Sequence, residues 1–511
     1  VSKNKKNPDV NLKNPYMMGF PTVATFKFVK ILVDNGFYVI KIDQVTDPPY
    51  PKRAITGIYS PGTYIDDIKS DSNNILSIYL EEIKQFNNSY SLLIGMSIID
   101  LSIGESIIHE TFSHTNDEKY SLDETLKFIH NFNPKEIIIN YKNLESYTED
   151  YLVSYLELHN RTFLISEFKS NEYSKISYQN NFLDSIFIKE SLLSNIEDLD
   201  LENCINGRLS FIILLNYCLK HNSSILNNIS KPKFYNKTNY LHLGNNALDQ
   251  LNIINYDKKL TSLFDIINYT ETPMGKRLLN FNLCNPICDV NILNDRYDKI
   301  EELNNRKLNL SNELKNIIDI ERYHRKISLQ TLNPCDFVIL DDSYQTILKI
   351  FDKVKNTKLK NIFTNEIRNE LQEYIRYYQN FYDFDEMQKF NLNDISNTFF
   401  KKNINSEIDL LQVEFNSNYQ QIKMLRDKLE EFIDVKKKDY FNSNTTEEKT
   451  PIDIKYNDKE KYYLSTTMKR GKTIKLQLAK KKIKINDREF CMNDFKFKEQ
   501  STLMKISTDF I

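Results

Sequence analysis

The sequence of 511 residues lacks tryptophan altogether and has only 10 glycines and 13 prolines. Its six cysteines are scattered without a C-x-x-C pair, which excludes a disulfide framework and indicates a reducing compartment. No apolar run approaches the roughly 20 residues of a membrane-spanning helix, and the Lys- and Asn-rich start has no apolar signal segment. We therefore expect a soluble intracellular protein with no membrane partner, in a compartment (nucleus, organelle, cytoplasm or viral factory) that the sequence leaves open.

An excess of basic charge is also missing, since 68 Lys and Arg residues stand against 70 Asp and Glu residues and the formal net charge is −2. Any contact with nucleic acid must therefore come from local clusters of basic residues. A chain of this length is too long for one hydrophobic core, so we expect roughly three to five domains of about 100–200 residues each.

Catalytic signatures are lacking as well. The seven histidines are scattered without H-E-x-x-H or Cys/His ligand spacing, and no G-x-S-x-G segment occurs. Gly471-Lys472-Thr473 resembles the end of a phosphate-binding loop, but Thr466 stands where that loop requires its first glycine. We also expect a β-hairpin here, which cannot point helix N-terminal N–H groups at phosphate. We therefore expect no catalytic site, no metal and no cofactor in this chain.

What the sequence does contain is an ordered series of motifs between residues 269 and 322. Thr272 suits an N-cap, Pro273 suits the first helical position, and Asn285-Pro286 suits the end of that helix. In order, the motifs are Tyr269-Thr270-Glu271-Thr272-Pro273-Met274-Gly275-Lys276-Arg277-Leu278-Leu279, Asn285-Pro286-Ile287 and Asp319-Ile320-Glu321-Arg322. Their order and separations resemble the core of the MutS family of DNA mismatch-repair proteins.

An earlier segment resembles the mismatch-recognition domain of the same family. Periodicity predicts a helix over 23–34 that stops at Gly36, a strand over 38–42, and a turn over 60–63 in which Gly62 takes a positive φ. The resembling residues are Tyr16-Met17-Met18-Gly19-Phe20-Pro21, Val39-Ile40-Lys41-Ile42-Asp43-Gln44, Asp47-Pro48, Arg53-Ala54-Ile55 and Ser60-Pro61-Gly62-Thr63. The resemblance assigns the recognition motif itself to Met18, Gly19, Phe20 and Pro21.

Residues 72–205 alternate between strand and helix patterns. We expect two strands around a turn within 92–105, a helix over 122–132 and a buried strand over 136–139. This order, with G-x-x-x-x-D-x-S-x-G-E starting at Gly95, resembles the MutS connector domain, which has a ribonuclease-H-like fold. Asp100 and Glu105 are either structural residues of a strand and turn or part of a metal site, which would need further carboxylates.

From about 206 to 400 the pattern is helical throughout, and the resemblance implies a core whose levers join a DNA clamp to an ATPase. We expect three apolar stripes at helical spacing to be core, and Met274 and Leu278 to be packing residues. The stripes are Leu260, Leu263, Phe264 and Ile267; Leu293, Tyr297, Ile300 and Leu303; and Leu340, Tyr344, Ile347, Leu348 and Phe351.

Residues 406–438 contain neither Gly nor Pro and repeat apolar residues every three or four positions. Ser406 with Asp409 predicts a capping-box start, and at ~1.5 Å per residue such a helix would extend about 50 Å. One interpretation is a lever packed against a second long helix, and the other is a coiled-coil dimerisation helix.

After this helix the period changes to that of strands. Alternating apolar residues predict strands over 452–456, 462–464 and 474–478, with Arg470-Gly471 as a hairpin turn. A small β domain at the tip of a long helix resembles the MutS clamp, and 495–503 resembles the start of the returning lever.

A dense basic cluster lies in this clamp-like region. Such charge attracts phosphate and predicts sequence-independent, salt-sensitive DNA binding, whereas a solvated surface without a ligand is the alternative. The residues that we expect to bind DNA are Lys436, Lys437, Lys438, Lys469, Arg470, Lys472, Lys480, Lys481, Lys482 and Lys484.

The resemblance as a whole implies a multidomain α+β protein. It implies a small mixed α/β recognition domain over 1–72, incomplete at its N-terminus, and a ribonuclease-H-like α/β connector over 73–205. An all-α core with long lever helices would follow over 206–435, and a small antiparallel β clamp with the start of the returning lever over 436–511.

The family's ATPase domain is expected outside this chain, so ATP and magnesium are implied for the full-length protein only. Expected partners are double-stranded DNA, an identical or MutS-like second subunit, and downstream repair factors. An abundance of Asn, Lys, Ile and Tyr resembles the giant-virus and octocoral-mitochondrial branch of the family, where a nuclease domain follows the ATPase.

One departure from the family pattern keeps other functions open. In mismatch-reading members an F-x-E pair precedes the M-x-G segment, but only 17 residues precede Met18 here and none is Phe. The first interpretation is the DNA-binding part of a mismatch-repair clamp. The alternatives are a paralogue that binds junction or recombination DNA without discriminating mismatches, and a long-helix structural protein whose basic tip binds a partner protein.

Overall fold

The computed structural model describes residues 19–508, except for 47–49, 66–71, 86–89, 115, 170–171, 189–190, 223, 236–239, 242, 244–246, 255–260, 362–363, 393–394, 396, 434–450, 458–460, 486–487 and 500–501. The chain divides into two compact units, and each is described by itself. The first unit comprises residues 1–378 with 387–394, and the second comprises 379–386 with 395–511. Helices and small mixed or antiparallel sheets occur together, which confirms the predicted α+β class.

The first unit begins with a short helix and a two-stranded sheet. The 3₁₀ turn η1 (Thr22–Ala24) leads into α1 (Thr25–Asp34), which ends just before Gly36 at φ +81°. Strands β1 (Val39–Gln44) and β2 (Arg53–Tyr59) then pair antiparallel. The predicted helix, its glycine stop and the following strand are confirmed.

The turn after β2 differs from its prediction in one respect. Among the described glycines only Gly36 and Gly104 have positive φ, so Gly62 does not supply the left-handed conformation that we expected. A Cβ at Gly62 would lie 2.3 Å from Cγ1 of Ile75. Close packing against the neighbouring strand, and not φ, is therefore what requires glycine here.

A six-stranded mixed sheet forms the centre of the first unit, with strand order β7-β6-β3-β4-β5-β8. Its antiparallel part confirms the two predicted strands around a turn, and β6 confirms the predicted buried strand. The strands are β3 (Asn74–Lys84), β4 (Tyr90–Asp100), β5 (Glu105–Phe112), β6 (Glu136–Lys142), β7 (Thr162–Glu167) and β8 (Lys233–Phe234).

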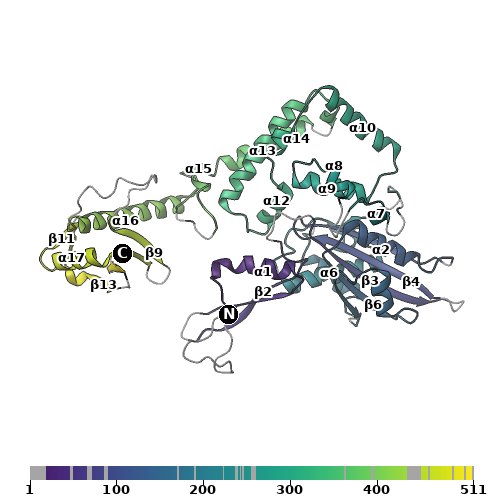
Figure 1. Ribbon diagram of the computed structural model, residues 1–511, viewed down its shortest axis with the longest axis horizontal. Coiled ribbons are helices and arrows are strands. Elements are labelled where there is room, and N and C mark those ends of the chain that lie inside the picture. Colours follow the sequence, from purple (N-terminus) through teal and green to yellow (C-terminus); the bar gives the residue numbers. More distant parts are fainter. Residues whose placement is uncertain are drawn as a thin grey trace. The chain divides into compact units, whose positions relative to one another are not determined.

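Helices cover both faces of this sheet, so alternate residues of each strand enter different cores. On one face α2 (Tyr120–Phe132), the predicted helix, and α3 (Glu149–Tyr155) pack on Leu76, Ile78 and Met96. On the other face α4 (Ile176–Asp184), α5 (Asn195–Asp198) and α6 (Ile205–His221) pack on Ile75 and Tyr79. Figure 1 shows α2 and α6 against the blue strands.

The prediction of helix throughout about 206–400 was wrong at 233–234, which form β8 and pair with β5. The described elements of 247–387 are helical, but their apolar stripes are buried unevenly. Leu340, Tyr344 and Phe351 are buried, which confirms the third stripe. The helices are α7 (Ala247–Gln250), α8 (Leu263–Ile267), α9 (Pro273–Cys284), α10 (Val290–Asn305), α11 (Ser311–Leu314), α12 (Ile320–Ser328), α13 (Pro334–Val354), α14 (Asn365–Gln379) and α15 (Phe384–Met387), with the 3₁₀ turn η3 (Lys358–Asn361).

The first two stripes are not core within the described residues. Leu263 in α8 is 42% exposed, Tyr297 and Ile300 in α10 are each 62% exposed, and Leu278 in α9 is 60% exposed. Leu260 lies outside the described residues. A helical stripe is buried only where another element covers it, so the sequence period alone gave the wrong result here.

The second unit packs the end of a long helix against a small sheet. Ile422, Leu425 and Leu429 of α16 (Ser406–Glu430) enter one core with the strands that follow. The sheet order is β13-β14-β10-β9, all antiparallel, and β11 pairs with β12 as a separate hairpin. The elements are β9 (Asp453–Asn457), β10 (Lys461–Thr467), α17 (Met468–Leu478), β11 (Ile483–Ile485), β12 (Arg488–Phe490), η4 (Met492–Asp494), β13 (Phe495–Glu499) and β14 (Leu503–Thr508).

Helix α16 departs from its prediction at its start. Its N-cap is Asn405, whose side-chain oxygen accepts from the backbone N–H groups of Glu407 and Ile408. The carboxylate of Asp409 instead accepts from the backbone N–H of Asn403, so the capping box predicted at Ser406 was wrong. The helix is described as far as Glu430, and residues 434–438 of the predicted span lie outside the described residues.

Two predictions for the following segment were also wrong. Residues 474–478 belong to helix α17 and not to a strand, because Ile474 and Leu478 are buried while Leu476 between them is 67% exposed. Burial four residues apart is the helical period. Residues 495–499 and 503–508 form β13 and β14, and not the start of a returning lever.

Gly95 in β4 offers a test of how closely α6 approaches the sheet. A Cβ there would lie 2.0 Å from the backbone oxygen of Asn206, whereas a Cβ at Gly19 has no atom within 4 Å. We expect Gly95→Ala to destabilise the first unit by roughly 1–3 kcal/mol or more through overpacking, and Gly19→Ala to leave stability nearly unchanged. Urea unfolding followed by circular dichroism measures both, and equal midpoints for the two variants would contradict the close approach.

Candidate functional site

Arg277 of the first motif and Asp319 of the third motif meet in one buried junction. Thr272 accepts from the backbone N–H of Gly275 at 3.0 Å and Pro273 occupies the first turn of α9, as predicted. The helix thereby aims Arg277 at α12, where its guanidinium donates to both carboxylate oxygens of Asp319 at 2.5 and 2.8 Å. The first and third motifs are therefore direct partners in space.

Asp319 has a side-chain exposure of 0%, and Arg277 has one of 12%. Arg277 also donates to Glu321 at 2.5 Å. Burial by itself lowers the pKa of Arg277, but its hydrogen bonds to the two carboxylates outweigh burial and raise that pKa above its usual value. Arg277 thus stays a cation in this buried position.

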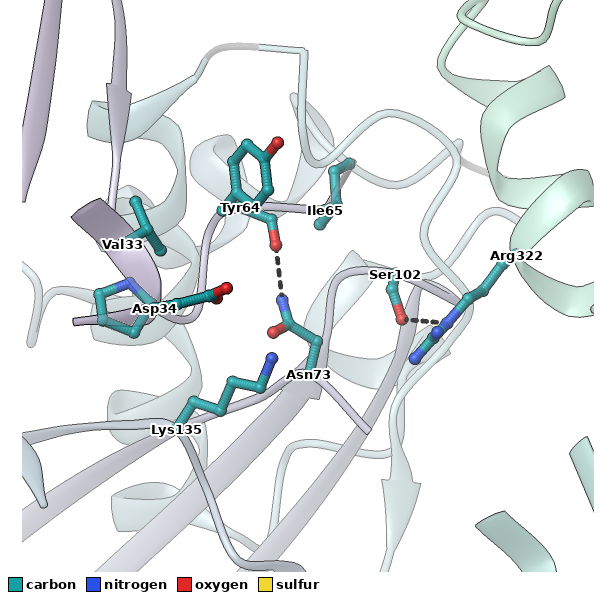
Figure 2. Close-up of a pocket in the computed structure, with 9 residues that line it drawn as sticks. Val33, Asp34, Tyr64, Ile65, Asn73, Ser102, Lys135 and Arg322 are labelled. Atoms are coloured by element: carbon teal, nitrogen blue, oxygen red, sulfur yellow. Dashed lines mark hydrogen bonds between the residues drawn. The ribbon is translucent and has the colours of Figure 1, made fainter. Parts of the chain in front are cut away.

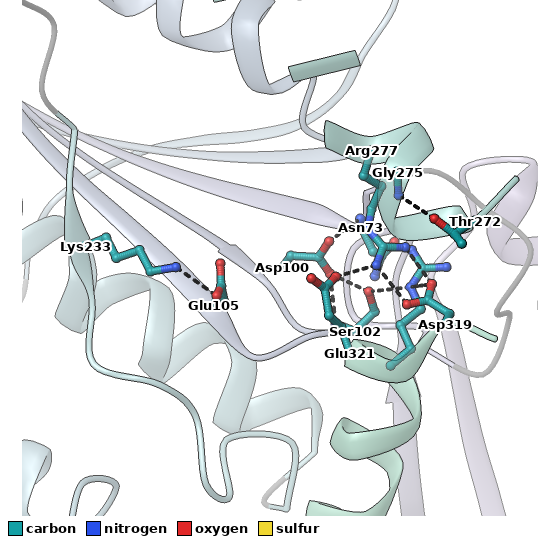
Figure 3. Close-up of polar contacts among 11 residues, drawn as sticks. Asn73, Asp100, Ser102, Glu105, Lys233, Thr272, Gly275, Arg277, Asp319 and Glu321 are labelled. Atoms are coloured by element: carbon teal, nitrogen blue, oxygen red, sulfur yellow. Dashed lines mark hydrogen bonds and ion pairs between the residues drawn. The ribbon is translucent and has the colours of Figure 1, made fainter. Parts of the chain in front are cut away.

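The junction continues from α12 into the turn between β4 and β5. Nε of Arg322 lies 3.6 Å from Asp319 and donates to the Ser102 hydroxyl at 3.1 Å. Ser102 donates in turn to Asp100 at 2.6 Å, and Asp100 accepts from the backbone N–H of Asn73 at 3.0 Å. Figure 3 shows this chain of polar contacts, which ties the helical segment to the sheet.

Arg325 strengthens the same contact through backbone oxygens. Its guanidinium donates to the backbone oxygens of Leu101 at 3.2 Å, Asn227 at 2.5 Å and Ile225. Burial lowers its pKa to about 10. Gly104, at φ +78°, lies where an added Cβ would be 3.3 Å from Arg325 Cδ, so both backbone conformation and close packing favour glycine.

Glu136 holds the N-terminal segment on the sheet, and sequence reasoning missed this role. It is fully buried at the start of β6 and accepts from Tyr38 at 2.7 Å, Ser60 Oγ at 2.6 Å, the Gly62 N–H at 3.1 Å and the Tyr217 hydroxyl. Burial and the Glu136 carboxylate raise the pKa values of both tyrosines. The one sequence signal for this role was a charged residue, Glu136, directly before the three isoleucines of a buried strand.

A small cavity lies between the Glu136 contacts and the Arg322 contacts. Asn73, Lys135 and Arg322 line it (Figure 2). Asn73 donates to the backbone oxygens of Gly62 and Tyr64 at 2.6 and 3.3 Å. The volume is about 40 Å³, which suits a few water molecules and not a nucleotide. The junction is therefore structural in its chemistry.

The contacts of Asp100 and Glu105 favour the structural alternative for both residues. Asp100 accepts from Ser102 in its own turn and from the backbone N–H of Asn73 just before β3, and Glu105 pairs with Lys233 at 2.8 Å. In the described part of the chain, no three His, Cys, Asp or Glu side chains gather in a way that could hold a metal ion.

The recognition motif is described from Gly19 onward, and Met18 lies outside the described residues. Phe20 stacks on Phe28 of α1 with ring centroids 4.6 Å apart, and Pro21 precedes η1 as its N-cap. Phe20 remains 48% exposed. These residues therefore start the helix and leave one aromatic ring partly accessible.

The predicted DNA-binding residues of the second unit lie on a helix, a turn and a short strand. Lys469 and Lys472 are exposed on α17 and Arg470 is half-buried there. The following turn and β11 carry four more exposed lysines, Lys480, Lys481, Lys482 and Lys484. Lys482 pairs with Glu489 at 3.2 Å, and Lys436, Lys437 and Lys438 lie outside the described residues. We call the residues from Lys469 to Lys484 the basic segment.

Gly471-Lys472-Thr473 lies inside α17, so the hairpin that we expected there was wrong. Strand β10 passes directly into this helix, with Thr467 as the N-cap. Thr466 is buried and donates to the backbone oxygen of Pro451. Because no glycine-rich loop separates strand from helix, these residues lack the phosphate cradle of a P-loop.

Within the described residues, every helix is too short or too polar to cross a lipid bilayer. Fold and junction together define a class: a multidomain α+β protein in which buried arginines fasten a helical segment to a mixed sheet.

Comparisons with known proteins agree with the motifs. A family model for MutS domain III matches residues 246–483. A putative DNA mismatch repair protein, a mutS homolog of Acanthamoeba polyphaga mimivirus, is 35% identical over 502 residues, covering 92% of this chain and 44% of the relative. The DNA mismatch repair protein MutS of Caldanaerobacter subterraneus subsp. tengcongensis is 29% identical over 380 residues, and that of Clostridium novyi is 30% identical over 369 residues.

These bacterial matches cover 72% and 68% of this chain, and 40% and 37% of the relatives. The chain belongs to the MutS family, as its motifs predicted. It spans less than half the length of each of these three relatives.

The Arg277–Asp319 pair can be tested by a double-mutant cycle. We expect Arg277→Ala and Asp319→Ala each to cost about 3–5 kcal/mol of unfolding free energy, because each removes the two-fold hydrogen-bond partner of a buried charge. The double variant should cost clearly less than the sum. Arg306→Ala, which removes only an exposed pair with Glu302, serves as the control. Additive costs in denaturant unfolding would mean that the pair does not act as a unit.

Proposed function

We propose that this chain is the DNA-binding part of a MutS-type mismatch-repair protein. It would hold duplex DNA as a clamp and act with an ATPase domain outside these residues. The observation that supports this most directly is the exposed basic segment of the second unit, in a chain of the MutS family.

The basic segment suits a phosphate backbone and not base edges. Its lysines extend from α17 over a turn to β11, so their ammonium groups form a strip of point charges. Ammonium groups bind phosphate without fixed geometry, which positions a protein on a duplex but carries no sequence information. Any discrimination between mismatched and matched DNA would then belong to the N-terminal segment that carries Phe20.

The junction around Asp319 and Glu136 supplies the mechanical part of the proposal. It fastens the N-terminal segment, the six-stranded sheet and the helical segment of the first unit to one another. We further propose that the protein works as a homodimer or with a MutS-like second subunit. ATP and magnesium would act in the full-length protein.

A salt titration of duplex binding tests the basic segment. In the variant with Lys480, Lys481, Lys482 and Lys484 all replaced by Ala, the slope of log K against log salt should fall in magnitude by at most ~3.6. Because Lys482 already pairs with Glu489, we expect a fall of roughly 2–3. Matched duplex, mismatched duplex and a four-way junction should be affected alike. An unchanged slope would leave these lysines as a solvated surface.

ATP turnover offers an independent check. We expect the purified chain to release no phosphate from ATP, because Lys472 lies within α17 and no cradling loop precedes it. A phosphate-release assay on wild type and Lys472→Ala measures this. Turnover by the wild type that the substitution abolishes would contradict the assignment.

A further inference from the structure

Asn73 takes part in two sets of buried contacts in the first unit. Its side-chain amide donates to the backbone oxygens of Gly62 at 2.6 Å and of Tyr64 at 3.3 Å, in the turn that follows β2. Its backbone N–H donates to the Asp100 carboxylate at 3.0 Å, in the turn between β4 and β5. One residue thus contacts the N-terminal segment through its side chain and the Asp319 junction through its backbone.

The peptide groups of Gly62 are bound from two sides. Its N–H donates to the Glu136 carboxylate at 3.1 Å, and its carbonyl oxygen accepts from Asn73. Glu136 begins β6 and Asn73 directly precedes β3, which is the neighbouring strand of the sheet. The contact through Asn73 continues across the turn between β4 and β5 to Arg322 of α12. A shift of the turn after β2 would therefore disturb a path of hydrogen bonds that reaches α12.

The amide oxygen of Asn73 is in a different position from its nitrogen. The two donations fix the orientation of the amide, because the reverse orientation would place its oxygen against two carbonyl oxygens. Asn73 is 3% exposed, and among the described residues no donor reaches its Oδ1. A buried acceptor that is left without a donor destabilises the folded state. Oδ1 therefore requires a donor that is not one of these contacts.

The small cavity that Asn73 lines has room for such a donor. Its volume of about 40 Å³ exceeds the ~10–15 Å³ that one water molecule needs. Figure 2 shows the amide oxygen of Asn73 turned away from Tyr64, towards the side that Lys135 lines. Arg322 is buried at the cavity, whereas Asp34 and Lys135 are exposed. The cavity thus extends from the surface to the buried amide.

The residues that line the cavity favour one class of ligand. An anion has no hydrogen to donate to Oδ1. A cation would lie in a lining with two basic side chains, those of Lys135 and Arg322, and with one carboxylate, that of Asp34. Protein sites for hard cations instead gather several oxygen ligands. Water can donate to Oδ1 and accept from a donor of the lining, so it suits both kinds of group.

We propose, independently of any DNA binding by the second unit, that Asn73 joins the turn after β2 to α12 and that a water molecule bound at its Oδ1 completes this joint. The water is a structural ligand of the cavity. Displacing it leaves Oδ1 without a donor, which loosens the turn and, through the Asp100 and Ser102 contacts, α12. The apolar layers on the two faces of the sheet are not part of this joint.

A high-resolution crystal structure of the chain tests the site directly. We expect an electron-density peak at hydrogen-bond distance from Asn73 Oδ1 that stays the same after crystals are soaked in rubidium chloride or in sodium bromide. An anomalous rubidium peak at that place would identify a cation site, and a bromide peak would identify an anion site. Either peak, or a direct donation from the Lys135 ammonium to Oδ1, would overturn the proposal.

A substitution in α1 tests the joint by the sign of its effect. Val33 and Val29 are one turn apart and are 3% and 4% exposed, but of the two Val33 alone lines the cavity. Val33→Ile adds one methylene that would displace the water. Filling an apolar void stabilises a protein, whereas removing the donor of a buried acceptor destabilises it. Val29→Ile is the matched control for crowding on α1.

Hydrogen–deuterium exchange followed by mass spectrometry measures the effect in each segment. In Val33→Ile, backbone amides of 60–65 should exchange roughly five- to thirtyfold faster than in the wild type, and those of α12 should also exchange faster. In Val29→Ile both segments should exchange as in the wild type. Unchanged or slower exchange of 60–65 in Val33→Ile would overturn the water site. Faster exchange of 60–65 without any change in α12 would overturn the joint.

Discussion

The buried carboxylate of Asp319 organises much of the first unit. It has no exposure to solvent, and a buried charge is tolerated only with a close partner, so Arg277 must come from α9 to meet it. Arg322 then carries the contact to Ser102 in the turn between β4 and β5. Two helices and a sheet turn are thereby held at one point by a chain of polar contacts.

Glu136 applies the same constraint at a second place. Its four donors come from the residue before β1, from the turn after β2 and from α6, so the N-terminal segment can dock only in the orientation that satisfies them. Apolar packing tolerates small shifts, whereas a buried carboxylate with directional donors does not. Relative placement within this unit thus depends on a few polar groups, while its stability depends on the two apolar layers of the sheet.

The second unit carries its basic side chains on the surface, whereas the first unit buries several charged side chains. Lysines follow α17 and the hairpin, on a chain whose total charge is close to neutral. Local concentration of charge, and not net charge, sets the field that a polyanion meets. Composition alone therefore said nothing about nucleic acid, whereas the positions of individual lysines did.

The sequence by itself determined what depends on neighbours within about four residues: the cap at Thr272, the stop at Gly36, the strands on either side of Gly104 and the order of the family motifs. It could not determine whether 474–478 is strand or helix, because the spacing of Ile474, Leu476 and Leu478 is compatible with both. Only in the folded structure are Ile474 and Leu478 buried and Leu476 exposed, which is the helical pattern. Nor could it show that the α10 stripe would be exposed.

Tertiary structure decided the pairings between distant residues. The residues around Glu136 indicate only that it begins a buried strand. The side chains that donate to it, those of Tyr38, Ser60 and Tyr217, are far away in sequence. Lys498 and Lys505 face each other only because β13 and β14 pair in one register. Local propensity acts along the chain, whereas burial and register act between distant segments, and interactions of the second kind formed the junction.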